Sequence, residues 1–150
     1  MTENGDLLAL ALAGRFDVIV HGCNCFCAMG GGIARTIREE FPEAYAADLA
    51  TPRGDIKKLG TFSSATVTRN GRQFTIINGY TQYHFHGADV LVDYPAVRRL
   101  FAKIKIEFPG KLIGYPKIGA GLAGGDWQIL AAIIDEELAG ENHSVVLYAP

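Results

Sequence analysis

The chain has 150 residues, a formal net charge of −2 and 49% hydrophobic residues. This length is typical of one domain, so we expect residues 1–150 to form a single domain, and we expect it to be a monomer. A net charge of this size and sign does not give the positive electrostatic field that attracts nucleic acid, so no nucleic-acid partner is expected. No apolar run approaches the roughly 18 residues of a membrane span, so we also expect no membrane partner. The first residues lack the basic segment of a signal peptide.

The three cysteines lie within five residues of one another, at positions 23, 25 and 27. An odd count at such close spacing argues against a disulfide framework. We therefore expect a reducing, cytoplasmic setting.

The first predicted elements surround a glycine-rich turn. A short buried strand over 17–20 precedes this turn, and a helix over 33–41 with helically spaced apolar residues follows it. Pro42 ends or kinks that helix, and a second helical piece covers about 43–50.

A hairpin comes next, because Asn70-Gly71 joins two β-branched and aromatic runs over 61–68 and 73–80. The remaining chain predicts an amphipathic helix over 94–108, a buried strand over 111–117, a helix over 126–138 and a last strand over 145–148. This alternation predicts an α/β fold with helices packed on a mixed sheet.

Two glycine-rich segments, 30–32 and 119–125, each lie between a predicted strand and a predicted helix. Such junctions gather unpaired backbone N–H groups and the positive end of a helix dipole, and glycine lets a ligand approach the backbone. A single loop of this kind can be only a turn. Two loops at one crevice favour a diphosphate held by amides.

Residues 119–124 also match G-x-G-x-x-G, the pattern of a Rossmann dinucleotide site. The context argues against that site, because only one strand's length of chain remains after residue 140. The P-loop motif is missing from the sequence.

The stretch HGCNCFCAMGGGIAR over 21–35 leaves a metal site, a cysteine nucleophile and a phosphate loop as alternatives. Structural zinc sites need a second pair of ligands, which the sequence lacks, so we expect no metal. Small buried cysteines packed beside the loop are the commoner explanation. We interpret His84 and His86 as solvated loop residues, and Asp126 as a helix N-cap.

Two polar residues of this stretch have open assignments. Asn24, at the end of a buried strand, must be hydrogen-bonded, either within its own loop or to a ligand hydroxyl. His21 is either a satisfied core histidine or a residue of the site.

Together these segments resemble the macrodomain family, and within it the yeast-type ADP-ribose 1″-phosphate phosphatases. The likeness extends over essentially the whole chain, with its blocks in the family's order: Gly5-Asp6-Leu7, Val18 to Cys25, Gly30 to Ala34, and Pro116 to Gly124. The resemblance implies a three-layer α/β/α sandwich with a central mixed sheet, a cleft for ADP-ribose or ADP-ribose 1″-phosphate, and no cofactor.

The resemblance also implies roles for individual residues. Asp6, followed by Leu7, matches the acidic residue that accepts from the adenine amino group, and Tyr148 matches the aromatic residue beside the adenine. Asn24 matches the asparagine that binds the distal ribose, and His21 matches the histidine of phosphatase-type members. The diphosphate and distal ribose would lie against Gly30, Gly31, Gly32, Ile33, Ala34, Gly119, Ala120, Gly121, Leu122, Ala123 and Gly124.

Two departures narrow the expected chemistry. Macrodomains that hydrolyse glutamyl-linked ADP-ribose through a lysine–aspartate pair have lysine where this chain has Gln82 and aspartate where it has Ala123. Reader-type members have asparagine in place of His21, so the histidine favours the phosphatase branch.

The resemblance thus predicts hydrolysis of ADP-ribose 1″-phosphate, a product of tRNA splicing, with His21 and Asn24 as the catalytic residues and no metal requirement. Histidine titrates near neutral pH and can activate water or protonate a leaving group. Removal of ADP-ribose from a modified macromolecule and non-enzymatic ADP-ribose binding are the alternatives.

Overall fold

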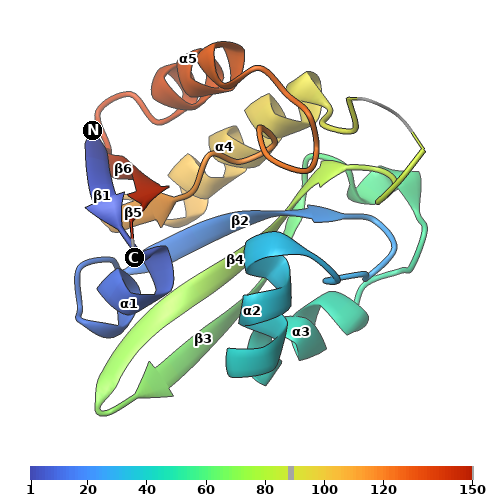
Figure 1. The fold of residues 1–150 in the computed structure, drawn as a ribbon. Helices are drawn as coiled ribbons and strands as arrows, with labels where there is room; N and C mark the ends of the chain where they lie inside the picture. The colour runs from blue at the N-terminus through green and yellow to red at the C-terminus, as the bar shows by residue number, and fades with distance from the viewer. Residues whose placement is uncertain (88–89, 150) are drawn as a thin grey trace.

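One mixed sheet runs through the centre of the computed structural model, which describes residues 1–87 and 90–149. In that part of the chain six strands pair in the order β1-β6-β5-β2-β4-β3 (Figure 1). All neighbouring strands are parallel except β3 and β4, which are antiparallel. The strands are β1 (Thr2–Gly5), β2 (Val18–Asn24), β3 (Phe62–Arg69), β4 (Arg72–Gln82), β5 (Leu112–Tyr115) and β6 (Asn142–Tyr148).

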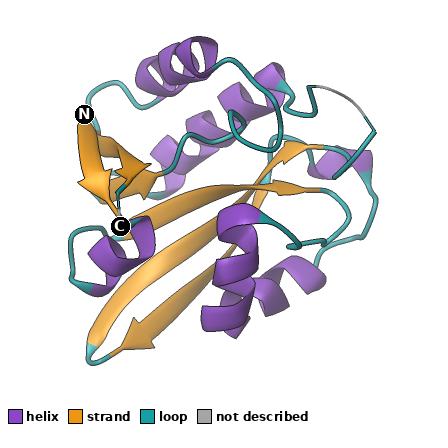
Figure 2. Ribbon diagram, viewed as in Figure 1, coloured by secondary structure: helices purple, strands orange, loops and turns teal. Residues whose placement is uncertain are grey.

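Helices cover both faces of this sheet and give the predicted three layers (Figure 2). The helices are α1 (Leu7–Leu12), α2 (Gly32–Glu40), α3 (Pro42–Leu49), the short 3-10 helix η1 (Ile56–Lys58), α4 (Tyr94–Glu107) and α5 (Trp127–Glu137). Side chains alternate between the two faces along each strand. Val18 and Val20 therefore join the core under α4 and α5, whereas Ile19 joins the core under α1, α2 and α3. The predicted α/β sandwich is confirmed.

The predicted hairpin is confirmed at its turn. Arg69 pairs with Arg72, and both residues between them have positive φ, 52° at Asn70 and 77° at Gly71. Asparagine and glycine adopt this left-handed conformation at lower cost than other residues, which is why the dipeptide predicts the turn.

The N-terminal strand and helix are additions to the predicted elements. The strand β1 has the sequence TENG and is not apolar, so only its parallel pairing with β6 makes it a strand. The helix α1 has six residues, too few to show a helical period, and its N-cap Asp6 accepts from the N–H groups of Leu8 and Ala9.

No helix in the described residues is both long and apolar enough to cross a membrane.

Candidate ligand-binding cleft

A cleft of about 560 Å³ lies at the carboxyl edge of the sheet. The parallel strands β1, β6, β5, β2 and β4 all end at this edge, so the segments that follow them gather there. Its lining comes from the last residues of β2 and β4 and from the segments after β2, β4 and β5. The lining residues are Gly22, Cys23, Asn24, Ala28, Gly30, Gly31, Gly32, Ile33, Ala34, Thr81, Gln82, Phe85, Leu91, Pro116, Lys117, Ile118, Gly119, Gly121, Leu122 and Ala123.

The two predicted glycine loops face each other across the cleft. The Cδ1 atom of Leu122 lies 3.0 Å from the place where a β-carbon on Gly31 would be. Most residues assigned to these loops line the cleft, and the exceptions are Ala120 and Gly124. Ala120 packs against the core instead, and the N–H of Gly124 donates to the carbonyl of Gly121.

Backbone N–H groups are the main donors of this cleft. Within the described chain, no internal hydrogen bond uses the N–H groups of residues 30–34 or of residues 121–123. The helix α2 begins here, and its N-cap, Gly31, provides no side-chain cap. The first N–H groups of a helix carry a partial positive charge and need acceptors, so the start of α2 suits an anionic ligand.

Both glycine loops were expected to offer the start of a helix to the ligand. The second loop does not. Asp126 caps α5 through the N–H of Gln128, so the start of this helix already has an acidic partner. The contribution of the second loop is therefore confined to the loop amides themselves.

The side chains of the cleft carry little charge. Lys117 is the one charged residue among the described lining residues, which include no aspartate, glutamate or histidine. An anionic ligand would therefore meet neutral donors and one cation, with no opposing carboxylate in the lining.

Asn24 lines the cleft, but its amide holds its own loop. Its Oδ1 accepts from the N–H of Phe26 at 2.9 Å, and its Nδ2 donates to the carbonyl of Ala28 at 2.8 Å. The side chain is 7% exposed. The sequence left open whether this amide bonds within its own loop or to a ligand, and the structure supports the bonds within the loop. Asn24 nevertheless lies beside the cleft.

His21 lies in the core, which is one of the two alternatives that the sequence left open. It is 1% exposed, it is not part of the cleft lining, and its Nε2 lies 2.7 Å from Oδ1 of Asn78. Burial lowers the pKa of His21 from 6.5 to about 4, so the ring is neutral near pH 7. Its link to the cleft is Cys23, a lining residue whose Sγ lies 3.6 Å from the ring.

The residues assigned to adenine lie at the same edge of the sheet, outside the cleft lining. Gly5, which precedes Asp6, pairs with Tyr148 at the ends of β1 and β6. Tyr148 is 75% exposed. Leu7 is buried in the core, so its side chain faces away from a ligand at this edge.

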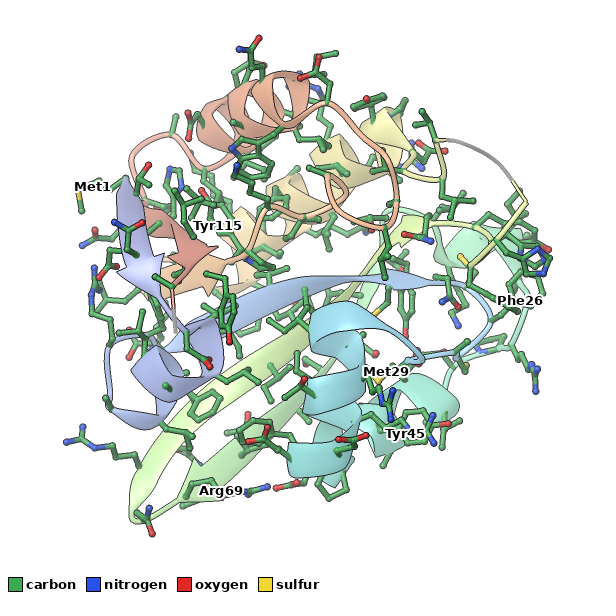
Figure 3. All side chains as sticks on the ribbon, viewed as in Figure 1. Met1, Phe26, Met29, Tyr45, Arg69 and Tyr115 are labelled. Atoms are coloured by element: carbon green, nitrogen blue, oxygen red, sulfur yellow. The ribbon has the colours of Figure 1, made fainter. Side chains whose placement is uncertain are left out.

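An aromatic cluster borders the cleft near Asn24 and was not foreseen from the sequence. The ring of Phe26 lies 4.6 Å from that of His84 and 6.1 Å from that of Phe85, which lines the cleft. Figure 3 shows Phe26 on the segment between β2 and α2, far across the molecule from Met1. His84 is thus half-buried against Phe26, whereas His86 is exposed as expected.

The buried Lys58 supports the loop between β2 and α2. Its Nζ donates to the carbonyl of Cys25 at 3.1 Å, lies 3.6 Å from Sγ of Cys27, and sits 4.5 Å from the ring centroid of Tyr80. The Tyr80 hydroxyl donates to Asp48 at 2.7 Å. Burial raises the pKa of Asp48, against the opposing effects of Tyr80 and Lys58. No sequence signal distinguished Lys58 from the exposed Lys57, because only the fold buries it.

The three cysteines are free and buried. Burial raises the pKa of the Cys25 thiol to about 11 and that of Cys23 well above its usual range. A protonated thiol is a poor nucleophile, so these two side chains act as packing residues. The described residues contain no group of three or more histidine, cysteine or acidic side chains placed to hold a metal ion.

Comparisons with known proteins agree with this architecture. No family model matches the chain. An uncharacterised 17.5 kDa protein of phage T4, encoded in the tk-vs intergenic region, is 35% identical over 136 residues, covering 87% of this chain and 84% of the relative. An ADP-ribose 1″-phosphate phosphatase of Debaryomyces hansenii is 28% identical, covering 88% of this chain and 90% of the yeast protein.

Solved structures share the whole fold. The macrodomain of Mycobacterium tuberculosis DarG superposes with a TM-score of 0.75 at 20% identity, covering 100% of this chain and 98% of that one. Thermosipho africanus DarTG in complex with ADP-ribose gives a TM-score of 0.72 at 14% identity, covering 90% of this chain and 38% of that one. A three-layer sandwich with a glycine-lined cleft at its carboxyl edge is the macrodomain architecture. The chain therefore has the macrodomain fold, and it belongs to one family with the uncharacterised phage T4 protein.

Burial of His21 predicts a pH-dependent stability. Its pKa is lower in the folded state than in the unfolded chain, so the unfolded chain binds the proton first as the pH falls. The free energy of unfolding should therefore be highest above about pH 7 and fall toward pH 4, by roughly 3 kcal/mol from this group. Urea unfolding at several pH values should show this slope reduced in His21→Gln and unchanged in the exposed control His86→Gln. Equal slopes in all three proteins would contradict the buried, neutral ring.

Lys58→Met should loosen the loop that carries Asn24. The variant loses the hydrogen bond to the carbonyl of Cys25 and the cation near Asp48, at a cost of about 3 kcal/mol. Thermal unfolding should show a lower midpoint for Lys58→Met and little change for Lys57→Met, its exposed neighbour. Faster amide hydrogen exchange over residues 24–28 should accompany the loss. Wild-type exchange in that segment would show that Lys58 does not hold it.

Proposed function

We propose that this macrodomain binds ADP-ribose and hydrolyses ADP-ribose 1″-phosphate to ADP-ribose and phosphate. The observation that carries the proposal is that two glycine loops face one cleft and that, among the described residues, their amides are unpaired and the lining has no carboxylate. A diphosphate needs several donors close together, and amides supply them without the cost of burying cations.

The proposed ligand would lie along the carboxyl edge of the sheet. The adenine would lie at the outer end, beside Asp6 and Tyr148, with the diphosphate between the glycine loops. Asp6 caps α1 through Oδ1, which leaves Oδ2 for the adenine amino group. The distal ribose would then lie near Asn24 and Gln82.

Hydrolysis in this cleft would depend on positioning and on electrostatic stabilisation. Water attacks the phosphorus of the 1″-phosphate, the bond from phosphorus to the ribose oxygen breaks, and that oxygen takes up a proton. The charge on the phosphoryl oxygens would be shared by loop amides fixed in advance, which need no reorganisation during the reaction. His21 would act on this step only indirectly, by packing against Cys23.

The phosphatase of Debaryomyces hansenii supports this substrate, because the two chains align over 88% of this one. The Thermosipho DarTG complex supports ADP-ribose as the ligand of the shared fold.

ADP-ribose binding without turnover is the second candidate. The described lining offers no imidazole or carboxylate to transfer a proton, a feature that favours a binding module. Release of ADP-ribose from a modified macromolecule uses the same cleft and is distinguished by its substrate.

Phosphate release from ADP-ribose 1″-phosphate in the presence of EDTA tests the proposed activity. We expect time-dependent release by the wild-type protein, with ADP-ribose as the second product by mass spectrometry. ADP-ribose binding by calorimetry, combined with no release, would favour the binding module. Release from ADP-ribosylated protein or DNA alone would favour the other hydrolase. Neither binding nor release would overturn the proposed function.

Gly30→Asp should block the phosphate part of the cleft. A β-carbon at Gly30 meets no atom within 4 Å, so the variant should fold, but its carboxylate would compete with the ligand for the amides. We expect ADP-ribose affinity to fall at least about tenfold in calorimetry, as for a repulsive charge at a diphosphate. Gly30→Asn has the same shape without the charge and should lose much less. Equal affinities of the two variants would place the diphosphate elsewhere.

A further inference from the structure

Thr81 occupies a β-bulge at the floor of the cleft. Cys23 pairs with Tyr80 and Asn24 pairs with Gln82, so Thr81 is the extra residue of β4 opposite β2. Its carbonyl accepts a hydrogen bond from the N–H of Asp93 at 2.8 Å instead of bonding to a neighbouring strand. Bulges are frequent beside functional sites because they redirect one side chain.

The hydroxyl of Thr81 is buried without a partner. The residue is fully buried, and its Oγ1 has no hydrogen-bond partner within the described residues. Buried hydroxyls are normally paired, so an unpaired hydroxyl in the lining of a cleft is a candidate donor to a ligand. Valine has nearly the same shape and would fill this position without that cost.

Gly22 keeps the hydroxyl close to the surface of the cleft. A β-carbon on Gly22 would lie 2.8 Å from Oγ1 of Thr81 and 3.3 Å from Cγ2 of Ile118. All three residues line the cleft, and Gly22 itself is only partly buried. Any side chain at position 22 would therefore cover the Thr81 hydroxyl.

We propose that Thr81 is a ligand-binding residue whose hydroxyl donates a hydrogen bond to an oxygen of the terminal phosphate on the distal ribose. This inference rests on the proposed function and adds a hydroxyl donor to a site whose main donors are backbone amides. Thr81 precedes Gln82, the residue that pairs with Asn24, at the end of the cleft assigned to the distal ribose. A neutral hydroxyl bonded to a charged oxygen forms a strong hydrogen bond and adds no charge to the unliganded cleft.

Thr81→Val and Thr81→Ser separate this role from a structural one. Thr81→Val removes an unpaired buried hydroxyl, so its thermal midpoint should equal or exceed that of the wild-type protein. Its affinity for ADP-ribose 1″-phosphate should fall about tenfold by calorimetry, as for a lost hydrogen bond to a charged group, and its affinity for ADP-ribose should fall less. Thr81→Ser should restore most of the phosphate preference.

Thr75→Val is the matched control in the same strand. The Thr75 hydroxyl lies 3.2 Å from that of Thr66, outside the cleft, so this variant should bind both ligands like the wild-type protein.

Two outcomes for a wild-type protein that binds ADP-ribose overturn the role of Thr81. The first is that Thr81→Val binds both ligands with unchanged affinity. The second is that Thr81→Val has a lower thermal midpoint and loses the same affinity for both ligands, which is the behaviour of a structural hydroxyl. If the wild-type protein binds neither ligand, the proposed function fails separately. In that case, titration with inorganic phosphate, followed by NMR through the amide resonance of Gly22, tests Thr81. The same shift of this resonance in the wild-type protein and in Thr81→Val would overturn the inference.

Discussion

Parallel strand pairing is the constraint on which the site depends. Five strands run in the same direction, so their carboxyl ends, and the segments that leave them, meet at one edge of the sheet. Both faces of the sheet are covered by helices, which leaves the edge as the place where loops can form a concave surface. The cleft, the two glycine loops, Asp6 and Tyr148 all lie there as a consequence.

The proposed anion site would depend on geometry more than on charge. Among the described residues, amides at the start of α2 and in the second loop have no hydrogen-bond partner, while buried polar groups hold the turn that precedes α2. Asn24 closes the turn from within, and Lys58 anchors the same turn from the core through the carbonyl of Cys25. Buried polar groups therefore fix the loop, and exposed amides remain for the ligand. This division would allow a protein with a net charge of −2 to hold the proposed diphosphate.

The site could be predicted only in part because sequence motifs locate backbone better than side chains. The glycine loops were correctly placed at one cleft, since glycines after a strand require a turn whatever surrounds them. The position of His21 stayed open, because helices cover both faces of the sheet and the alternation of side chains along β2 does not show which residues reach the cleft. Thr81 and Lys58 gave no signal at all. A bulge depends on the pairing of β2 with β4, and the burial of Lys58 depends on how η1 packs against Tyr80.

The sequence by itself determined the local elements with strong periodicity or turn chemistry, namely the hairpin at Asn70-Gly71, the amphipathic helices and the buried central strands. It also determined the α/β class, because alternation of strands and helices leaves few other arrangements. Only the tertiary structure decided that TENG is a strand, that Asn24 closes its loop, and that the His21 ring lies in the core. These outcomes depend on partners that are distant along the chain. The strand β1 pairs with Val145 to Tyr148, and His21 contacts Asn78, and neither contact can be predicted from the local sequence.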